Sequence, residues 1–375
     1  MIHPPFCPQP TCRFHSGKDL PKGWYKRVGF YDTEAFGEVQ RFACKRCGKS
    51  FSVQTFSIDY YTKRPLPYPR LLKHLITTSN IRDMARDFSV SVDVVLNKLS
   101  RLSRNCIAAL QQLQRETLLI EDLAADGFES FTVSQFFPCH INLLAGSKSQ
   151  LVYWFDYVTL RRKGRMTDEQ RERRDELERL FKADPKGIEH SFRRLYTMLS
   201  HLICDGPRLK VGLATDLHPA YTRAARKHIC LGALKTQQRV VHQRVSSRKE
   251  RTWNNPLFSV NYLDRQIRKD LAEHVRETVC FGRNVNNAID RMIIYLTYNN
   301  LIKPHREVKG DLRSHAEVAG VSSEVVRSIR YGMFKRRAFL SKVKPEGRYR
   351  KMWLRAYVTP LKEKPEYLPK HVKAA

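Results

Sequence analysis

The hydrophobic periodicity of this chain changes near residue 119, and the change dictates a mixed α/β fold. Before it, residues 66–118 place apolar side chains three and four positions apart, the spacing of helices with one buried face. After it, aromatic and β-branched residues dominate at 128–133, 140–145 and 151–160, and these runs predict strands of a sheet. We therefore expect a multidomain α/β protein in which a helical unit precedes a sheet.

Shorter patterns outline the rest of the chain. The run at 209–215 predicts a further strand, and the opposite charges at 163–183 are typical of a solvated helix because they recur three and four positions apart. We also expect helices at about 187–203, 219–228, 262–276 and 284–300, and a helical pair near 312–342.

The charge of the chain indicates a polyanionic partner. Its 375 residues include 68 Lys+Arg and 37 Asp+Glu, and the formal net charge of +31 predicts salt-sensitive attraction to nucleic acid. The length predicts about two to four folded units and excludes a small disulfide scaffold. A hydrophobic content of 42% excludes a disordered basic tail. The sequence has neither a long apolar run nor a secretory signal, so we expect no membrane partner, a cytoplasmic, nucleoid-associated location and reduced cysteines.

Two close pairs of cysteines near the N-terminus form the strongest local motif. Each pair can present two thiolates to one tetrahedral ion, so the spacing predicts a structural zinc ribbon over residues 1–62 that binds Zn²⁺. Four unrelated core or redox cysteines are the alternative. His15 could replace one ligand, although we expect it to face solvent. The four expected ligands are Cys7, Cys12, Cys44 and Cys47.

Residues 66–118 have the pattern of a helix-turn-helix DNA-binding domain. Ala85 lies where two helices must approach closely, Val90 lies in the turn, and Ser91 can cap the second helix. An ordinary helical hairpin with a solvated basic face is the alternative. The second helix should expose side chains suited to base edges and phosphates in a major groove: Asn97, Lys98, Arg101 and Arg104.

A weaker copy of this pattern lies near the C-terminus. Residues 315–327 have similar turn chemistry, with Ser322 or Ser323 as the cap. The basic region 308–375 would then contain a second helical DNA-binding unit, and a plain helical hairpin is the alternative.

Two carboxylates lie at strands in this otherwise basic chain. Asp216 ends the strand predicted at 209–215, and Asp126 lies on the first strand of the same region, followed by a turn-forming glycine. If the two strands are neighbours, their carboxylates meet and repel each other unless divalent cations lie between them. The alternatives are a helix cap for Asp216 and a surface turn for Asp126.

Asp264 is the candidate for a third acid. It lies beside the apolar stripe of a predicted helix, which can pack on the sheet and deliver one carboxylate to its edge. An exposed ion pair with Arg268, one turn further on, is the alternative. Glu250 is a rival third ligand, and Glu273 and Glu277 are more distant ones.

Together these segments resemble the DDE-type transposases of bacterial insertion sequences, in which a zinc ribbon and a helix-turn-helix precede a ribonuclease-H-like domain. Each matching stretch is short, but their order is specific. The resemblance implies a ribonuclease-H-like mixed sheet flanked by helices over residues 119–307, with a charged helical insertion at 163–183. The matching stretches are residues 41–52, 125–129, 215–221, 261–265 and 295–305.

The resemblance also implies a metal-dependent reaction on DNA. The three acids of the family map onto Asp126, Asp216 and Asp264, the last at a position that is more commonly Glu. They would hold two Mg²⁺ (or Mn²⁺) ions for strand cleavage and strand transfer at the ends of an insertion element. The implied partners are double-stranded DNA, at the element ends and the target, and further copies of the chain in a homo-oligomer on that DNA.

Basic residues around the acids would neutralise backbone phosphates. Two other functions would use the same features: a sequence-specific DNA-binding regulator without catalysis, and a metal-dependent nuclease on the same fold. The basic residues are Arg223, Arg226, Lys227, Arg239, Arg244, Arg248, Lys249 and Arg251.

Overall fold

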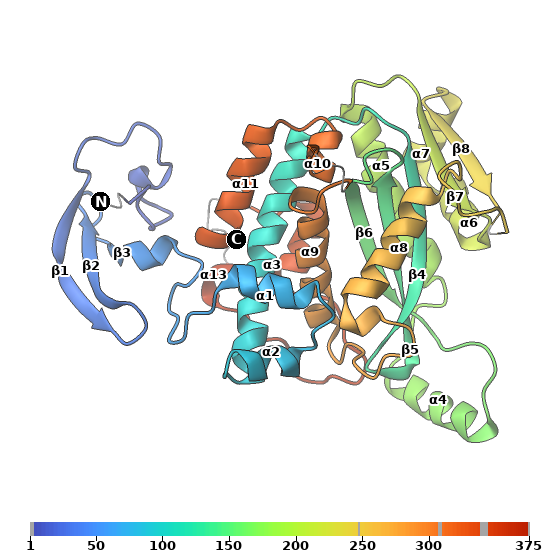
Figure 1. Cartoon of the computed structure of the whole chain (residues 1–375), viewed down its shortest axis with the longest axis horizontal. Helices are drawn as coiled ribbons and strands as arrows, with labels where there is room; N and C mark the ends of the chain where they lie inside the picture. Colours follow the sequence, from blue (N-terminus) through green and yellow to red (C-terminus); the bar gives the residue numbers. More distant parts are fainter. Residues whose placement is uncertain (1–3, 247, 307–309, 338–343, 374–375) are drawn as a thin grey trace.

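A small antiparallel sheet, a group of helices and a larger mixed sheet make up the computed structural model (Figure 1). Parts of the predicted ribbon, sheet region and C-terminal region lie outside the described residues: 1–3, 247, 307–309, 338–343 and 374–375. The structure describes residues 4–246, 248–306, 310–337 and 344–373.

The N-terminal part has its own sheet and its own core. Trp24 stacks on Phe51 with ring centroids 5.7 Å apart and an interplanar angle of 10°. These rings belong to a hydrophobic cluster distinct from the main core, and Figure 1 shows this part standing apart from the other elements. Its elements are η1 (Arg13–His15), the antiparallel strands β1 (Tyr25–Thr33), β2 (Gly37–Cys44) and β3 (Ser50–Ser52), and η2 (Val53–Phe56).

Three helices follow, α1 (Tyr68–Leu75), α2 (Ile81–Asp87) and α3 (Val92–Glu116). The Asn80 side chain accepts hydrogen bonds from the Arg82 and Asp83 N–H groups at the start of α2, and the Ser91 hydroxyl accepts one from the Val94 N–H at the start of α3. These caps satisfy N–H groups that have no partner inside a helix, so they fix where both helices begin. The predicted Ser91 cap is confirmed.

The main sheet confirms the mixed α/β class. Its strand order is β6-β5-β4-β7-β8, with β4, β5 and β6 antiparallel in sequence order and β7 and β8 parallel to β4. The strands are β4 (Leu123–Thr132), β5 (Ser134–Gly146), β6 (Val152–Thr159), β7 (Val211–Asp216) and β8 (Val240–Val245).

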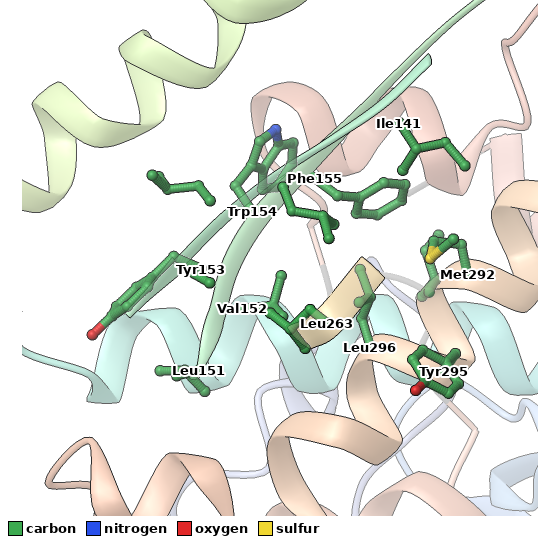
Figure 2. Packing of buried hydrophobic residues seen from close by; sticks show 14 of the residues in the cluster. Ile141, Leu151, Val152, Tyr153, Trp154, Phe155, Leu263, Met292, Tyr295 and Leu296 are labelled. Carbon is green, nitrogen blue, oxygen red and sulfur yellow. The ribbon is translucent and has the colours of Figure 1, made fainter. Parts of the chain in front are cut away.

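Helices cover both faces of the sheet. Successive strand residues point to opposite faces, so Asn142 bonds Ser191 of α5 (Gly187–Asp205) while its neighbour Ile141 packs near Met292 of α9 (Val285–Leu301). Helix α8 (Phe258–Asp270) contacts β4 and β5. Figure 2 shows side chains of α8 and α9 among those of β5 and β6 in this core: Leu263, Met292, Tyr295, Leu296, Ile141, Val152 and Phe155.

The remaining helices surround this core. Helix α4 is charged and extends away from the sheet in Figure 1, with Leu177 buried. Within the described residues, no helix combines the length and the apolar character that crossing a bilayer requires. These helices are α4 (Asp168–Leu180), α6 (Pro219–Arg226), α7 (Ile229–Thr236), η3 (Ala272–His274), α10 (His315–Val318), α11 (Ser323–Lys335), α12 (Gly347–Trp353) and α13 (Lys370–Lys373).

One hydrophobic core joins α3 to the main sheet. Leu99 and Leu113 of α3 belong to the same buried cluster as Leu143 of β5 and Ile293 of α9. Helix α3 also packs on α9 and α11. Helices α1–α3, which follow the N-terminal antiparallel sheet, are therefore joined to the main sheet by apolar burial, the dominant favourable term in folding.

Candidate functional site

The four predicted cysteines converge on one point. All their sulfur atoms lie within 4.8 Å of one another, with Cys7 Sγ 3.5 Å from Cys47 Sγ and Cys12 Sγ 3.8 Å from Cys44 Sγ. Tetrahedral coordination with Zn–S bonds of about 2.3 Å places sulfurs about 3.8 Å apart. This cluster could therefore bind a structural metal such as zinc.

Local backbone turns position these thiols. Cys44 ends β2, and the Gly48 N–H donates to the Cys44 carbonyl at 2.9 Å, closing the turn that carries Cys47. Gly48 has φ +72°, a conformation that glycine adopts without strain. The expectation that His15 faces solvent is wrong: its ring is buried against Phe6, with Nδ1 2.7 Å from the Cys7 carbonyl oxygen.

Strand pairing brings Asp126 and Asp216 to the same level of the main sheet. Strands β4 and β7 are parallel neighbours, and the last pair in their register is Ala125 with Thr215. The two aspartates are the next residues on each strand. Neighbouring strands lie about 4.8 Å apart and equivalent positions of parallel strands face the same side, so the two carboxylates are neighbours.

Hydrogen bonds orient both carboxylates. Asp126 Oδ1 accepts the Gly127 N–H at 2.8 Å and the Tyr221 hydroxyl at 3.3 Å, and Asp216 Oδ1 accepts the His218 N–H at 2.7 Å. Burial, reinforced by the negative charge of Asp216, raises the pKa of Asp126 to about 7. Without a cation, Asp126 therefore binds a proton more tightly than an ordinary carboxyl group does.

Helix α8 turns Asp264 toward the same place. Its Oδ1 is buried and has no hydrogen-bond partner among the described residues. Burial raises the pKa of Asp264 well above its ordinary value, and the charge of Asp126 adds to this rise while Arg268 and Arg251 oppose it. Burial and the charges of Asp126, Asp216 and Asp264 also raise the pKa of Tyr221, so all three acids act on one side chain.

The three acids are spaced more widely than the four thiols. Across the described residues, the cysteine cluster is the one set of three or more candidate ligands whose atoms all lie within 4.8 Å of one another. In a two-metal site the ions lie about 3.5–4 Å apart and different carboxylates can hold different ions. Asp126, Asp216 and Asp264 do not meet the closer criterion, but the charge of Asp216 acts on Asp126 and the charge of Asp126 acts on Asp264.

The structure bears on the alternative roles of two of these acids, a helix cap for Asp216 and an ion pair with Arg268 for Asp264. Asp216 bonds the N–H of His218, but the His218 side chain is itself the cap of α6. Asp264 has no ion pair with Arg268 in the described part of the chain, because the Arg268 guanidinium donates to the carbonyls of Glu129 and His274.

The rival third acids differ from Asp264 in exposure or in partner. Glu250 and Glu277 are exposed, and Glu273 is buried in an ion pair with Arg291 at 2.6 Å.

Sequence reasoning missed the role of Gly127. It was expected in a turn, but it lies inside β4, opposite Asn142. A Cβ atom at Gly127 would overlap the side chains of Asn142 and His140. Glycine therefore allows β5 side chains to approach the strand beside Asp126, and Tyr221, whose sequence segment was noted without a role, fixes the Asp126 carboxylate.

The predicted DNA-reading face of α3 is largely occupied by protein contacts. The expectation that Lys98 and Arg104 are exposed is wrong, because they are 2% and 8% exposed. Lys98 Nζ lies 2.6 Å from Asp59 Oδ1, and Arg101 donates to the carbonyls of Ile58 and Tyr60 and to the Asn97 side chain. Asn97 is exposed.

No protein-family model and no curated protein matches the chain.

Proposed function

We propose that this protein is a Mg²⁺-dependent DNA transposase with a ribonuclease-H-like catalytic region and an N-terminal zinc ribbon. The observation that carries the proposal is the parallel pairing of β4 and β7, which makes Asp126 and Asp216 neighbours. Asp264, on α8, adds a third half-buried carboxylate whose pKa responds to Asp126. Perturbed carboxylates of this kind are typical of functional sites.

The three acids would hold Mg²⁺ (or Mn²⁺) because hard cations prefer oxygen ligands. When bound, the ions supply activation of the attacking hydroxyl and stabilisation of the leaving 3′-oxygen. Tyr221 and the Gly127 N–H fix one carboxylate, and the His218 N–H fixes the other. The protein thus orients its ligands before DNA binds.

Several exposed basic residues, among them Arg251, whose charge acts on Asp126 and Asp264, are suited to phosphate contacts. Arg223 and Lys227 are less available, because both pair with the buried carboxylate of Glu189 at 3.1 and 2.7 Å. Exposed cations can neutralise backbone charge and make binding salt-dependent. Those with no ion pair among the described residues are Arg226, Arg244, Arg248, Lys249 and Arg251.

The test uses labelled DNA that carries the gene and both of its flanks. With Mg²⁺ we expect the wild type to cut at the element ends and to join those ends to a target. Asp126→Asn and Asp216→Asn should each reduce cleavage about 1,000-fold or more, because several kcal/mol of charge stabilisation is lost. Glu250→Gln, which removes an exposed carboxylate, is the matched control and should retain activity.

A mobility-shift assay separates catalysis from binding. The two aspartate variants should still bind the same DNA, because the phosphate contacts come from other residues. Full cleavage by either variant would contradict the proposal and favour the regulator. Cleavage without joined products would indicate a nuclease.

A further inference from the structure

An exposed aromatic stack lies on and before helix α8. Trp253 stacks on Phe258 with centroids 4.2 Å apart and planes 23° apart, and Phe258 stacks on Tyr262 at 5.9 Å and 15°. The Trp253 side chain is 65% exposed. We call these three residues the α8 aromatic stack.

Trp253 differs from the other tryptophans because its side chain is not packed into a hydrophobic core. The other three tryptophans, Trp24, Trp154 and Trp353, are 6% exposed or less. An indole left in water forgoes the favourable burial of a large apolar surface. The two rings behind it also hold its orientation, so its accessible surface is presented in a defined direction.

Cations flank the α8 aromatic stack. The Arg306 guanidinium lies 5.4 Å from the centre of the Trp253 ring, and Lys303 Nζ lies 5.7 Å from the centre of the Tyr262 ring. Arg306 is exposed on a long flexible stem, so it can shift toward a phosphate. A flat π surface bordered by positive charge suits a nucleotide, which combines a π face with an anion.

The stack lies in the same stretch of sequence as Arg251 and Asp264. Trp253 follows Arg251 by two residues, and the positive charge of Arg251 acts on both Asp126 and Asp264. Tyr262 precedes Asp264 by two residues on α8. Helix α8, which carries Asp264, therefore also carries Phe258 and Tyr262, the two rings behind Trp253.

We propose that Trp253, backed by Phe258 and Tyr262, is a stacking platform for an unpaired base of the DNA strand beside the acids. The proposal rests on the proposed function for the identity of the nucleic acid. The positive charges around the stack and the net charge of +31 favour this occupant over an apolar protein segment. Base–aromatic stacking tolerates any sequence because every base has a π face.

The test measures binding without cleavage. Fluorescein-labelled oligothymidine and a blunt duplex of the same length are titrated with full-length protein in buffer without Mg²⁺, and anisotropy gives both dissociation constants. Trp253→Ala should weaken oligothymidine binding about 5-fold to 150-fold, the range for loss of one base–aromatic stack. Trp253→Phe should retain most of the affinity, and duplex binding should change much less.

Tyr367→Ala is the matched control, because Tyr367 is 85% exposed. It should bind oligothymidine as the wild type does. Tryptophan emission gives a second readout: oligothymidine should quench the wild type but not Trp253→Phe, since the other indoles are buried.

Unchanged oligothymidine affinity in Trp253→Ala would overturn the platform, and so would an equal loss for oligothymidine and duplex. Because no cleavage is required, this outcome is distinguishable from failure of the proposed function. If the wild type does not cut DNA but Trp253→Ala still weakens oligothymidine binding, the proposed function fails and the stacking platform is supported.

Discussion

Replacing Asp126 by Asn should stabilise the Mg²⁺-free protein, and increasingly so as the pH rises. The folded state raises the pKa of Asp126 from 3.8 to about 7, so folding favours the protonated form. Stability from this group is fully present below its unfolded pKa and is lost as the pH rises through the folded pKa. Asn is neutral at every pH and keeps an oxygen that can accept from Gly127 and Tyr221.

The size of the effect follows from the shift. A difference of about 3 pKa units corresponds to about 4 kcal/mol in the free energy of unfolding once the pH exceeds about 7. Between pH 5 and pH 8, the advantage of Asp126→Asn over the wild type should grow by about 2.5 kcal/mol. Taking the difference between the two proteins cancels the titration of shared groups on which Asp126 does not act, such as the buried imidazoles, whereas Asp264 does not cancel because the charge of Asp126 raises its pKa.

The assay is urea unfolding followed by circular dichroism across this pH range, without chelator so that the cysteine cluster is undisturbed. Asp205→Asn, which removes an exposed carboxylate at the end of α5, is the control and should follow the wild type. Added Mg²⁺ should stabilise the wild type at pH 8 but not Asp126→Asn. Parallel pH profiles for the wild type and Asp126→Asn would refute the reasoning.

Three further changes test other parts of the structure. Cys44→Ser should lower bound zinc from about one ion per chain toward zero after dialysis, measured by elemental analysis, whereas the exposed Cys230→Ser should keep it; a fully loaded Cys44→Ser would contradict the cluster. Gly127→Ala should cost about 1–3 kcal/mol in urea unfolding because its methyl group overlaps β5 side chains, whereas Gly232→Ala, with open space in α7, should be neutral or stabilising by up to about 1 kcal/mol; equal effects would refute the overlap. Lys98→Ala should cost about 3 kcal/mol because it leaves a partly buried carboxylate unpaired, and a variant as stable as the wild type with weaker DNA binding would restore Lys98 as a DNA contact.

Local sequence patterns predicted several of the strands and helices. The run expected at 209–215 forms β7, and the helices expected at 187–203 and 284–300 form α5 and α9. Each was predictable because its apolar residues repeat with the period of the element itself. The cysteine cluster was predictable for a related reason, since each pair is set by a short turn.

Elements that depend on distant partners were not predictable. Strand β8 has buried valines only at its two ends, with exposed or half-buried residues between them, so it lacks the alternation typical of a strand, and it pairs with β7 at the edge of the sheet. Lys98 lies on a helix face that sequence periodicity leaves in solvent, yet Asp59, far earlier in the chain, covers it. Both outcomes follow from tertiary contacts that no local window contains.

The candidate site lies between these cases. Two aspartates at strand positions could be identified from the sequence, but their proximity depends on β4 and β7 being neighbours. The sequence could not predict which way the Asp264 side chain points, because a helix carries side chains all around its axis. Gly127 gave no sign of its role, since only the opposite strand shows why a methyl group is excluded there.

Helix α3 runs for 25 residues without interruption, about 37 Å, and its buried side chains merge with those of the sheet. If its first turn docks on a duplex, no hinge separates that turn from the three acids. The distance between the bound DNA sequence and the acids is then fixed. Sliding the recognised sequence by one base pair, about 3.4 Å, would then present a different phosphate for cutting. The spacing between bound sequence and cut position would be dictated by the architecture of the protein rather than by the DNA.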